Sequence, residues 1–174
     1  TRTYTININR QAASANNAGG NNNQNNNNQN NTDVNITSGK YSIGTYITGI
    51  EPGTSAADFV KNIAVSASGT VKLLTSSGSE NSGKIATGNK VAVYDASGNL
   101  KKTYDIVIYG DINGDGAVNA LDMIKLNRHI LGKGTLTGAY LEAADANRKR
   151  DGGNALDMII MNRHILGKSK ISQN

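Results

Sequence analysis

The alternation of apolar and polar residues predicts short strands in the first two thirds of the chain. Residues 1–10 place Tyr4, Ile6 and Ile8 at every second position, which is the period of a β-strand. Because one strand is not stable alone, we interpret it as the last strand of an upstream β-module. Further strands are predicted at 41–50, 71–74, 90–94 and 103–109, and a short helix at 56–63.

Residues 38–109 are predicted to form a small α+β module of about four strands and one helix. Pro52-Gly53 marks a turn before the helix, Thr54 or Ser55 can cap it, and residues 91–108 have the pattern of a hairpin. The module contains no His or Cys and no clustered carboxylates, so the sequence offers no catalytic set there. We interpret it as a structural spacer that packs against the segment after it, with a ligand-binding role left open.

Residues 11–37 are of low complexity. The central part, residues 21–31, consists of nine Asn and two Gln. Such a tract has no apolar surface to offset the entropy of ordering the chain, so 11–37 is predicted to be a disordered linker. A prion-like role is the rival interpretation of Asn-rich tracts, and an interdomain tether is their commoner use.

The strongest pattern in the chain is an internal repeat within residues 110–168. The segment 120–133 recurs at 155–168 with twelve of its fourteen residues identical, at an offset of 35. Both copies have the apolar period of a helix, and Gly132 and Gly167 are predicted to end the two helices.

Each repeated helix follows a loop rich in Asp and Asn. The first loop, residues 111–122, fits the calcium-loop pattern D-x-[DN]-x-[DN]-G-x5-[DE] at every defined position. Ca²⁺ takes about six to eight oxygen ligands, which alternate residues of such a loop bring together, and Gly116 permits the sharp turn at position 6. The alternative is an Asx-rich turn that caps the helix without metal. The predicted ligands are Asp111, Asn113, Asp115, the carbonyl of Ala117, Asn119 and Asp122.

The second loop, residues 145–157, is irregular. It has thirteen residues instead of twelve, and its alignment with the first loop places two extra residues before Asp151. The loop also contains three positive side chains, Arg148, Lys149 and Arg150. Their charges repel a divalent cation at close range, although screening at the surface weakens this repulsion. The loop is therefore a weaker calcium candidate than the first, and its basic segment can instead serve as a contact patch. The predicted ligands are Asp145, Asn147, Asp151 and Asp157.

Composition and charge narrow the function classes. Only 37% of the residues are hydrophobic and 5% aromatic, so part of the chain is not packed core. The chain has no Cys, which excludes disulfides and thiolate metal sites, and no apolar run long enough to span a membrane. The net charge is +5 at pH 7, yet seven of the thirteen acidic residues lie between 111 and 157, which supports cation-binding loops.

The duplicated calcium loop and helix, with Asn at position 9, Asp at position 12 and no helix before the first loop, resembles the dockerin domain. The resemblance covers residues 110–168. It implies an all-α fold of three helices, in which two EF-hand-like loop–helix repeats are joined by a middle helix within 137–144. It also implies a cohesin, a β-sandwich receptor of a scaffoldin or cell-surface anchor, as the partner in cellulosome- or amylosome-type complexes. Residues 38–109 are similar to a companion module, and 169–174 are predicted to be a C-terminal tail.

The family's recognition residues lie at loop positions 10 and 11 and near positions 17, 18 and 22. Many dockerins have Ser-Thr at positions 10 and 11, whereas this chain has Ala-Leu in both repeats, which replaces hydroxyl groups with a small apolar patch. Because the two halves match, a two-fold rotation would present nearly the same face to a cohesin. His129 and His164 are interpreted as surface residues rather than zinc ligands. The partner-binding residues implied are Ala120, Leu121, Asn127, Arg128, Ala155, Leu156, Asn162 and Arg163, with Gly132 and Gly167 near position 22.

Three functions are compatible with these sequence features. The first is a calcium-dependent module that docks a secreted bacterial protein, such as a glycoside hydrolase or a carbohydrate-binding protein, onto a cohesin at the cell surface. The second is a calcium-stabilised structural or carbohydrate-binding appendage, with residues 38–109 as the binding part. The third, a nucleic-acid binder, is suggested only by the net positive charge and lacks a basic helix face with aromatics. We expect the first, without catalysis or membrane insertion and with a monomeric dockerin.

Overall fold

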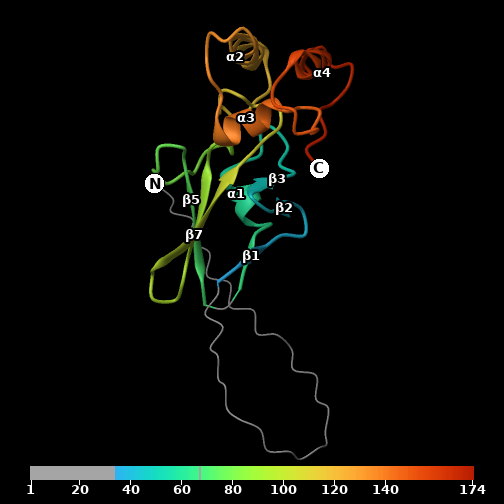
Figure 1. The fold of residues 1–174 in the computed structure, drawn as a ribbon. Helices are drawn as coiled ribbons and strands as arrows, with labels where there is room; N and C mark the ends of the chain where they lie inside the picture. Colours follow the sequence, from blue (N-terminus) through green and yellow to red (C-terminus); the bar gives the residue numbers. More distant parts are fainter. Residues whose placement is uncertain (1–33, 67) are drawn as a thin grey trace, which may run out of the picture.

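A β-sheet module and a helical domain lie one above the other in the computed structural model (Figure 1). The structure describes residues 34–66 and 68–174. The strand predicted at 1–10 and the part of the predicted linker that runs from 11 to 33 lie outside the described residues.

The described part of the sheet module contains seven short strands: β1 Ile36–Thr37, β2 Ser42–Ile43, β3 Tyr46–Thr48, β4 Ala64–Val65, β5 Thr70–Leu74, β6 Lys90–Tyr94 and β7 Leu100–Ile106. Five of them form one sheet in the order β2-β3-β7-β6-β5, and β1 pairs separately with β4. β3 and β7 run parallel, whereas the other neighbours are antiparallel. The predicted hairpin is confirmed as the pair β6–β7, which has a register shift at Val93 and Tyr94.

Three predictions for this module need correction. The prediction of about four strands is too low, because strands of two or three residues are too short to show a period. Val34 and Ile36 are only 7% and 4% exposed, so residues 34–37 belong to the fold and not to the linker predicted for 11–37. The strand predicted at 103–109 ends at Ile106, because the backbone of Ile108 bonds to the Thr87 hydroxyl instead of a strand.

One short helix, α1 (Ala56–Val60), contributes to the core of the sheet module. It begins after Ser55, whose side chain accepts the Asp58 N–H at 3.1 Å, as predicted for a cap. It ends at Val60, three residues before the predicted end at 63. Phe59 is 1% exposed and stacks on Tyr41 with ring centroids 5.1 Å apart, which anchors the helix to the strands.

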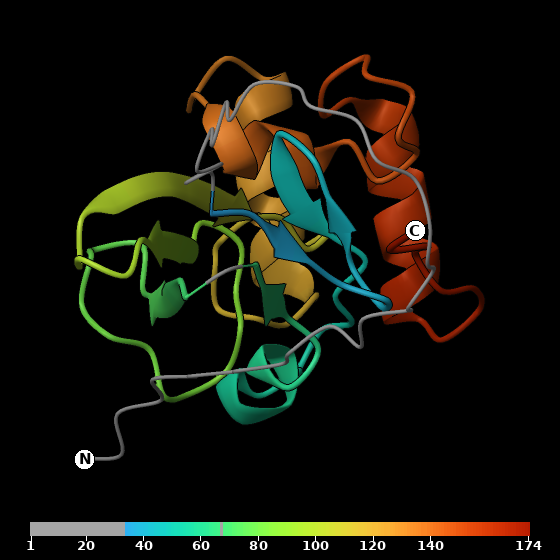
Figure 2. The ribbon, with the colours of Figure 1, turned by 90° about the horizontal axis from the view of Figure 1, so that it is seen from below.

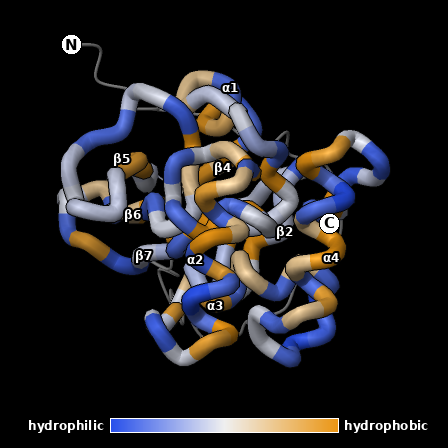
Figure 3. Tube along the Cα trace, turned by 90° about the horizontal axis from the view of Figure 1, so that it is seen from above, coloured by the Kyte–Doolittle hydropathy of each residue, from blue (hydrophilic) through white to orange (hydrophobic). Residues whose placement is uncertain are grey.

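The helical domain consists of α2 (Ala120–Ile130), α3 (Gly138–Ala144) and α4 (Ala155–Ile165), which confirms the predicted three helices. α2 and α4 contact each other, and α3 lies between them and the sheet (Figure 1). Seen from above, apolar and polar residues alternate along the helices (Figure 3). The repeat equivalents Leu126 and Met161 are both fully buried and fill the shared core. None of the helices among the described residues is long and apolar enough to cross a membrane.

The last six residues belong to the helical domain, which corrects the prediction of a tail at 169–174. Ile171 and Gln173 are each 3% exposed. The Gln173 side chain accepts the Tyr109 N–H at 2.8 Å and donates to the Tyr109 carbonyl at 3.0 Å. The C-terminal segment therefore runs back under α4 towards the sheet module (Figures 1 and 2), and Ile171 adds to the core of the helical domain. The sequence gives little sign of this, because Ile171 is the one apolar residue in the segment.

Candidate metal centres and interaction surface

The first loop wraps its backbone around Asp111, which is fully buried. Its Oδ1 accepts the N–H groups of Gly114 and Asp115 at 2.9 and 3.0 Å, and its Oδ2 accepts the N–H of Gly116 at 3.1 Å. A further hydrogen bond comes from the sheet module, where Thr87 donates its N–H to Oδ2 at 2.8 Å. The carboxylate at loop position 1 is therefore fixed by both parts of the protein.

Asp122 closes the other end of the first loop and is also fully buried. Its Oδ1 accepts two loop N–H groups at 2.9 Å, and its Oδ2 accepts the N–H of Asn119 at 2.9 Å. The Asn119 side chain in turn accepts the N–H of Leu121 at 2.8 Å, which completes a capping box at the start of α2. Asn154 and Asp157 form the same box at the start of α4.

Burial controls the electrostatics of the first loop. In the absence of a metal ion it raises the pKa of Asp111 to about 6, and the negative charge of Asp122 adds to this shift. Burial also raises the pKa of Asp122. Carboxylates that are costly to ionise alone are stabilised most by a nearby cation. The buried pair therefore fits a divalent cation.

The remaining predicted ligands of the first loop are more open. Asp115 is exposed, and its carboxylate accepts the Ala117 N–H at 2.9 Å and the Asn113 side-chain amide at 2.7 Å. Asn113 and Asn119 are half-buried, and Ala117 is exposed. All of these groups offer oxygen, which is the donor that Ca²⁺ prefers. The structure thus brings Asp111 and Asp122 into the interior and leaves Asp115 at the rim.

The second loop repeats the backbone pattern of the first with different residues. Asp145 is 2% exposed and accepts the N–H groups of Lys149 and Arg150 at 3.2 and 2.6 Å. Asp111 accepts the N–H groups at the same loop positions, 5 and 6. The two loops are therefore in register through position 6, and the extra residue follows Arg150. This corrects the alignment that placed two extra residues before Asp151.

Two arginines take the backbone conformation that glycines take in the first loop. Gly114 and Gly116 have φ angles of 77° and 79°, and their counterparts Arg148 and Arg150 have φ angles of 56° and 59°. This left-handed region favours glycine, because a Cβ crowds the backbone there. The second loop therefore keeps the shape of the first at a cost in backbone strain.

In this register Asp151 joins the second site from position 7. One ligand atom each of Asp145, Asp151 and Asp157 lie within 4.8 Å of one another, the one group of three such side chains found in 34–66 and 68–174. The Asn147 amide donates to Asp151 at 3.5 Å. Burial raises the pKa of Asp157, and the charges of Asp145 and Asp151 add to the shift. The loop predicted to be the weaker calcium candidate thus holds the closer carboxylate cluster, and its oxygen donors fit Ca²⁺.

Both histidines close the helices instead of facing the loops. His129 accepts the Leu136 N–H through Nδ1 at 3.3 Å, and His164 accepts the Ile171 N–H through Nδ1 at 3.1 Å. The equivalent contacts seven residues ahead indicate a structural role in ending each repeat.

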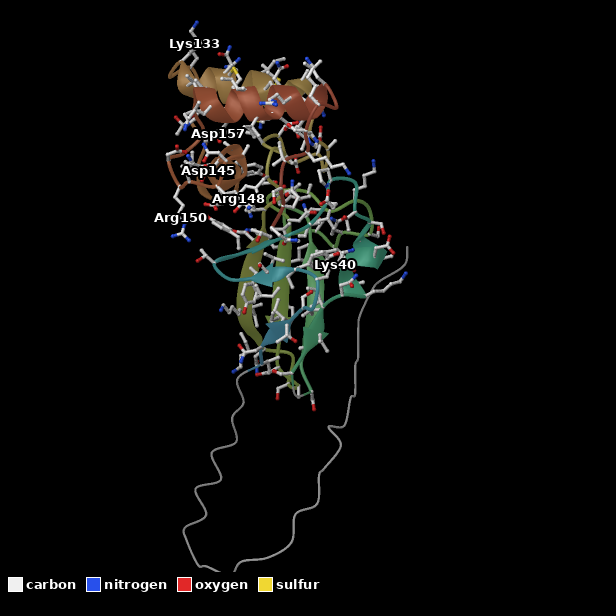
Figure 4. All side chains as sticks on the ribbon, turned by 90° about the vertical axis from the view of Figure 1, so that its right-hand side faces the viewer. Lys40, Lys133, Asp145, Arg148, Arg150 and Asp157 are labelled. Carbon is white, nitrogen blue, oxygen red and sulfur yellow. The ribbon has the colours of Figure 1, made fainter. Side chains whose placement is uncertain are left out.

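Near the second loop, Arg148 lies against its own domain. Its guanidinium is 5.9 Å from the centre of the Tyr109 ring, and the Tyr109 hydroxyl donates to Glu142 at 3.1 Å. Burial, followed by the charge of Glu142, raises the pKa of Tyr109 to about 12. Arg150 lies at the outer edge of the loop, beyond Asp145 (Figure 4). The three cations of the loop are thus not equivalent.

All eight predicted partner-binding residues are exposed on α2 and α4. Leu121 and Leu156 are each 58% exposed. Sequence reasoning missed two further pairs: Ile124 and Ile159 are 55% and 56% exposed, and Leu131 and Leu166 are 57% and 59% exposed. The signal for them was the repetition of apolar residues at helical spacing from the predicted positions. The full sets are Leu121, Ile124, Arg128 and Leu131 along α2 and its C-cap (the α2 stripe), and Leu156, Ile159, Arg163 and Leu166 along α4 and its C-cap (the α4 stripe).

One comparison with known proteins identifies part of the chain. The family model of the type I dockerin domain matches residues 109–166. No curated protein and no solved structure matches the chain significantly. The match confirms the resemblance inferred from the repeat and covers both loops and all three helices of the helical domain.

Proposed function

We propose that this chain, whose residues 109–166 match the family model of the type I dockerin domain, docks the protein that carries it onto a cohesin in a calcium-dependent manner. A dockerin is a binding module and not a catalytic one, and dockerin domains bind Ca²⁺ and recognise cohesins. The observation that carries the proposal for this chain is the pair of exposed apolar stripes on α2 and α4.

The α2 and α4 stripes have the chemistry of a protein-binding surface. Each places three large apolar side chains, all more than half exposed, around one arginine. Contiguous exposed apolar residues rimmed by polar groups mark interaction sites on folded proteins. The leucines and isoleucines would supply the buried contact, and Arg128 or Arg163 would supply charge-assisted hydrogen bonds at its edge. Ala120, Asn127, Ala155 and Asn162 complete the surface.

The two stripes give the partner-binding surface an approximate two-fold symmetry. Every member of the α2 stripe has an identical counterpart on the α4 stripe at an offset of 35. A cohesin could therefore meet either helix in the leading position after a two-fold rotation. The repeats differ nearby, since Lys125 is replaced by Ile160 and the Arg148–Arg150 segment exists in the second repeat alone. These differences give the two orientations different charge.

Calcium connects to this surface through the helix starts. The ligands we assign lie in the loops that directly precede α2 and α4. Asn119 and Asp122 form the capping box of α2, and Asn154 and Asp157 form that of α4. The Ala-Leu pair of each repeat lies between these two residues, so the metal would fix its orientation. The assigned ligands are Asp111, Asn113, Asp115, Ala117, Asn119 and Asp122 in the first loop, and Asp145, Asn147, Asp151 and Asp157 in the second.

The family also suggests the setting. We propose a secreted bacterial protein, such as a glycoside hydrolase or a carbohydrate-binding protein, that is held at the cell surface or on a scaffoldin by a cohesin. The sheet module would then be a companion of the dockerin and not its catalytic part.

The test is a binding assay of the full chain against a panel of cohesins, with and without Ca²⁺. Leu121→Asp and Leu156→Asp place an acidic residue in the first turn of a helix, which the helix dipole tolerates, so the fold should persist. We expect each single change to weaken binding by less than about 10-fold, and the double change to weaken it by more than about 1,000-fold, as for the central residues of an interface.

Leu100→Asp is the matched control, because Leu100 is 56% exposed but lies on β7 in the sheet module. It should leave cohesin binding unchanged. If either single change on the helices removes all affinity, one orientation is used and the symmetry has no role in binding. Retention of the chain on polysaccharide gels, with no cohesin bound, would instead favour a carbohydrate-binding appendage.

A further inference from the structure

We propose that the sheet module acts as the outer shell of the first calcium loop, so that its turn around Thr87 positions Asp111 for the metal. This inference rests on the proposed function, since it takes the first loop to bind Ca²⁺. It assigns a role to the sheet module and makes calcium binding at the first loop, unlike the second, dependent on that module.

Thr87 holds Asp111 from two directions. Its backbone N–H donates to Asp111 Oδ2 at 2.8 Å, and its hydroxyl donates to the Ile108 carbonyl at 3.2 Å and accepts the Ile108 N–H at 3.1 Å. The same Ile108 carbonyl accepts the Asp111 N–H at 3.0 Å. Both the backbone and the carboxylate of Asp111 are thus tied to one residue of the sheet module, and all three residues are buried.

The module also fits closely against the turn of the loop. Gly53 donates its N–H to the Gly116 carbonyl at 2.9 Å. A Cβ added at Gly116 would lie 2.5 Å from the Ile85 carbonyl oxygen, and one added at Gly114 would lie 2.9 Å from the Thr87 carbonyl oxygen. Real Cβ atoms do not approach backbone so closely, so the two surfaces are complementary at the level of single atoms.

Tyr140 fills the remaining space between the two parts. It comes from α3, and its ring lies between the module turn and the loop. A Cβ added at Gly88 of the module would overlap the Tyr140 hydroxyl, and one added at Gly114 would lie 3.0 Å from the ring. The first loop is therefore enclosed by the module on one side and by α3 on another.

The second loop has no such support from the sheet module. Throughout 34–66 and 68–174, the hydrogen bonds to the Asp145 carboxylate come from Lys149 and Arg150 of its own loop. Arg148, Lys149 and Arg150 are exposed. The sheet module thus supports the first loop and not the second, so the two metal sites should respond differently to a change in the module.

An outer shell matters because it fixes a ligand before the metal arrives. Hydrogen-bond partners of metal ligands typically contribute about 10- to 100-fold to metal affinity. A ligand that is already oriented loses less conformational freedom on binding. By linkage, calcium bound at the first loop should in turn stabilise the turn around Thr87.

The test measures calcium affinity by calorimetry on the full chain with the second site silenced by Asp157→Asn. Thr87→Ala removes the hydroxyl that anchors Ile108 and should weaken the remaining site by about 10-fold. Thr87→Ser keeps the hydroxyl and should restore the affinity. In the reciprocal background, Asp122→Asn, the same Thr87→Ala change should leave the affinity of the second loop unaltered.

Val71→Ala controls for general loss of stability, because Val71 is a core residue of β5 in the sheet module and is 4% exposed. It should destabilise the module without changing calcium affinity at the first loop. An equal loss of affinity in Val71→Ala and Thr87→Ala would overturn the proposal, as would unchanged affinity in Thr87→Ala. Absence of calcium binding at the first loop of the unaltered chain would instead contradict the proposed function itself.

Amide hydrogen exchange gives a second readout that does not depend on a variant folding well. Because the Thr87 N–H donates to a proposed calcium ligand, calcium should slow the exchange of this amide in the unaltered chain. We expect a factor of about 10 or more, which is the range given above for the effect of hydrogen-bond partners on metal affinity. The amide of Val93 in β6, away from the loop, should not respond to calcium. Exchange at Thr87 that is the same with and without calcium would contradict the coupling.

Discussion

The two loops that precede α2 and α4 reach the same shape by different means. In both, the first aspartate is buried and accepts backbone N–H groups from positions 5 and 6. In both, positions 4 and 6 have left-handed backbone. The first loop uses glycine at these positions, and the second uses arginine.

Their surroundings explain the difference. The glycines of the first loop lie against the backbone of the sheet module, where no Cβ fits. Glycine is therefore required there both for the left-handed backbone and for lack of space. The arginines of the second loop are both exposed and Arg148 rests on Tyr109 of its own domain, so their side chains have room and the left-handed backbone is the remaining cost. Packing against the module, rather than the metal-binding pattern, therefore decides where glycine is required.

Removal of calcium should have the largest effect on this pair of loops. A ligand that binds only the folded state stabilises it by about 4 kcal/mol per site at a thousand-fold excess over Kd. With EDTA, we expect the melting temperature of the helical domain to fall and cohesin affinity to fall with it. Circular dichroism of the full chain with and without EDTA measures this, and an unchanged melt would show that calcium is not linked to folding.

The metal-free protein should become less stable as pH rises, because of the first loop. The pKa of Asp111 is about 6 in the folded chain against an ordinary value of 3.8, so the folded state binds more protons between these values. The contribution of Asp111 to the free energy of unfolding is therefore fully present below about pH 4 and is lost by about pH 7, with an amplitude of about 3 kcal/mol. Urea unfolding in a calcium-free buffer at both pH values tests this. The change Asp111→Asn should remove most of the dependence, and a dependence that survives it must come from other groups.

A Cβ at position 6 of the first loop should cost more than one in the second loop. Gly116→Ala combines a left-handed φ of 79° with a contact of 2.5 Å to the Ile85 carbonyl oxygen, and we expect a loss of about 3 kcal/mol. Gly152→Ala is the matched control, because Gly152 has a φ of 72° but its nearest neighbour is a Leu141 methyl group at 3.9 Å. It should lose only the conformational part, about 1 kcal/mol. Equal losses, measured by urea unfolding, would show that close contact with the sheet module adds no cost at Gly116.

The helical domain could be predicted from short-range patterns in the sequence. The repeat, the first-loop motif and the apolar period of 120–133 and 155–168 are short-range features. The structure confirmed the three helices and the family match confirmed the resemblance to a dockerin, whereas the calcium ligands stay a prediction. β6 at Lys90–Tyr94 was predicted at its observed bounds, because its run of apolar residues is bounded by turn residues.

Features that depend on distant residues were out of reach. Residues 34–37 belong to the fold because Ile36 pairs with Val65, and nothing in their composition shows this. Gln173 is buried because it bonds to the backbone of Tyr109, 64 positions away in the chain. The register of the second loop depends on hydrogen bonds to Asp145, which a count of residues between acids does not show.

The smallest effect should come from giving the second loop the glycine of the first. Arg150→Gly relieves a left-handed φ of 59°, and we expect the free energy of unfolding to rise by about 1 kcal/mol. Lys149→Gly is the matched control: it removes the same charge one position earlier, where φ is not positive, so the added chain entropy of glycine should lower stability by about 0.5–1 kcal/mol. Both changes remove one cation beside Asp145, Asp151 and Asp157, so calcium affinity of the second loop should rise similarly in both. Stability, measured by urea unfolding, therefore separates strain from charge: changes of opposite sign support the strained loop, and changes of the same sign would mean that charge alone distinguishes the second loop from the first.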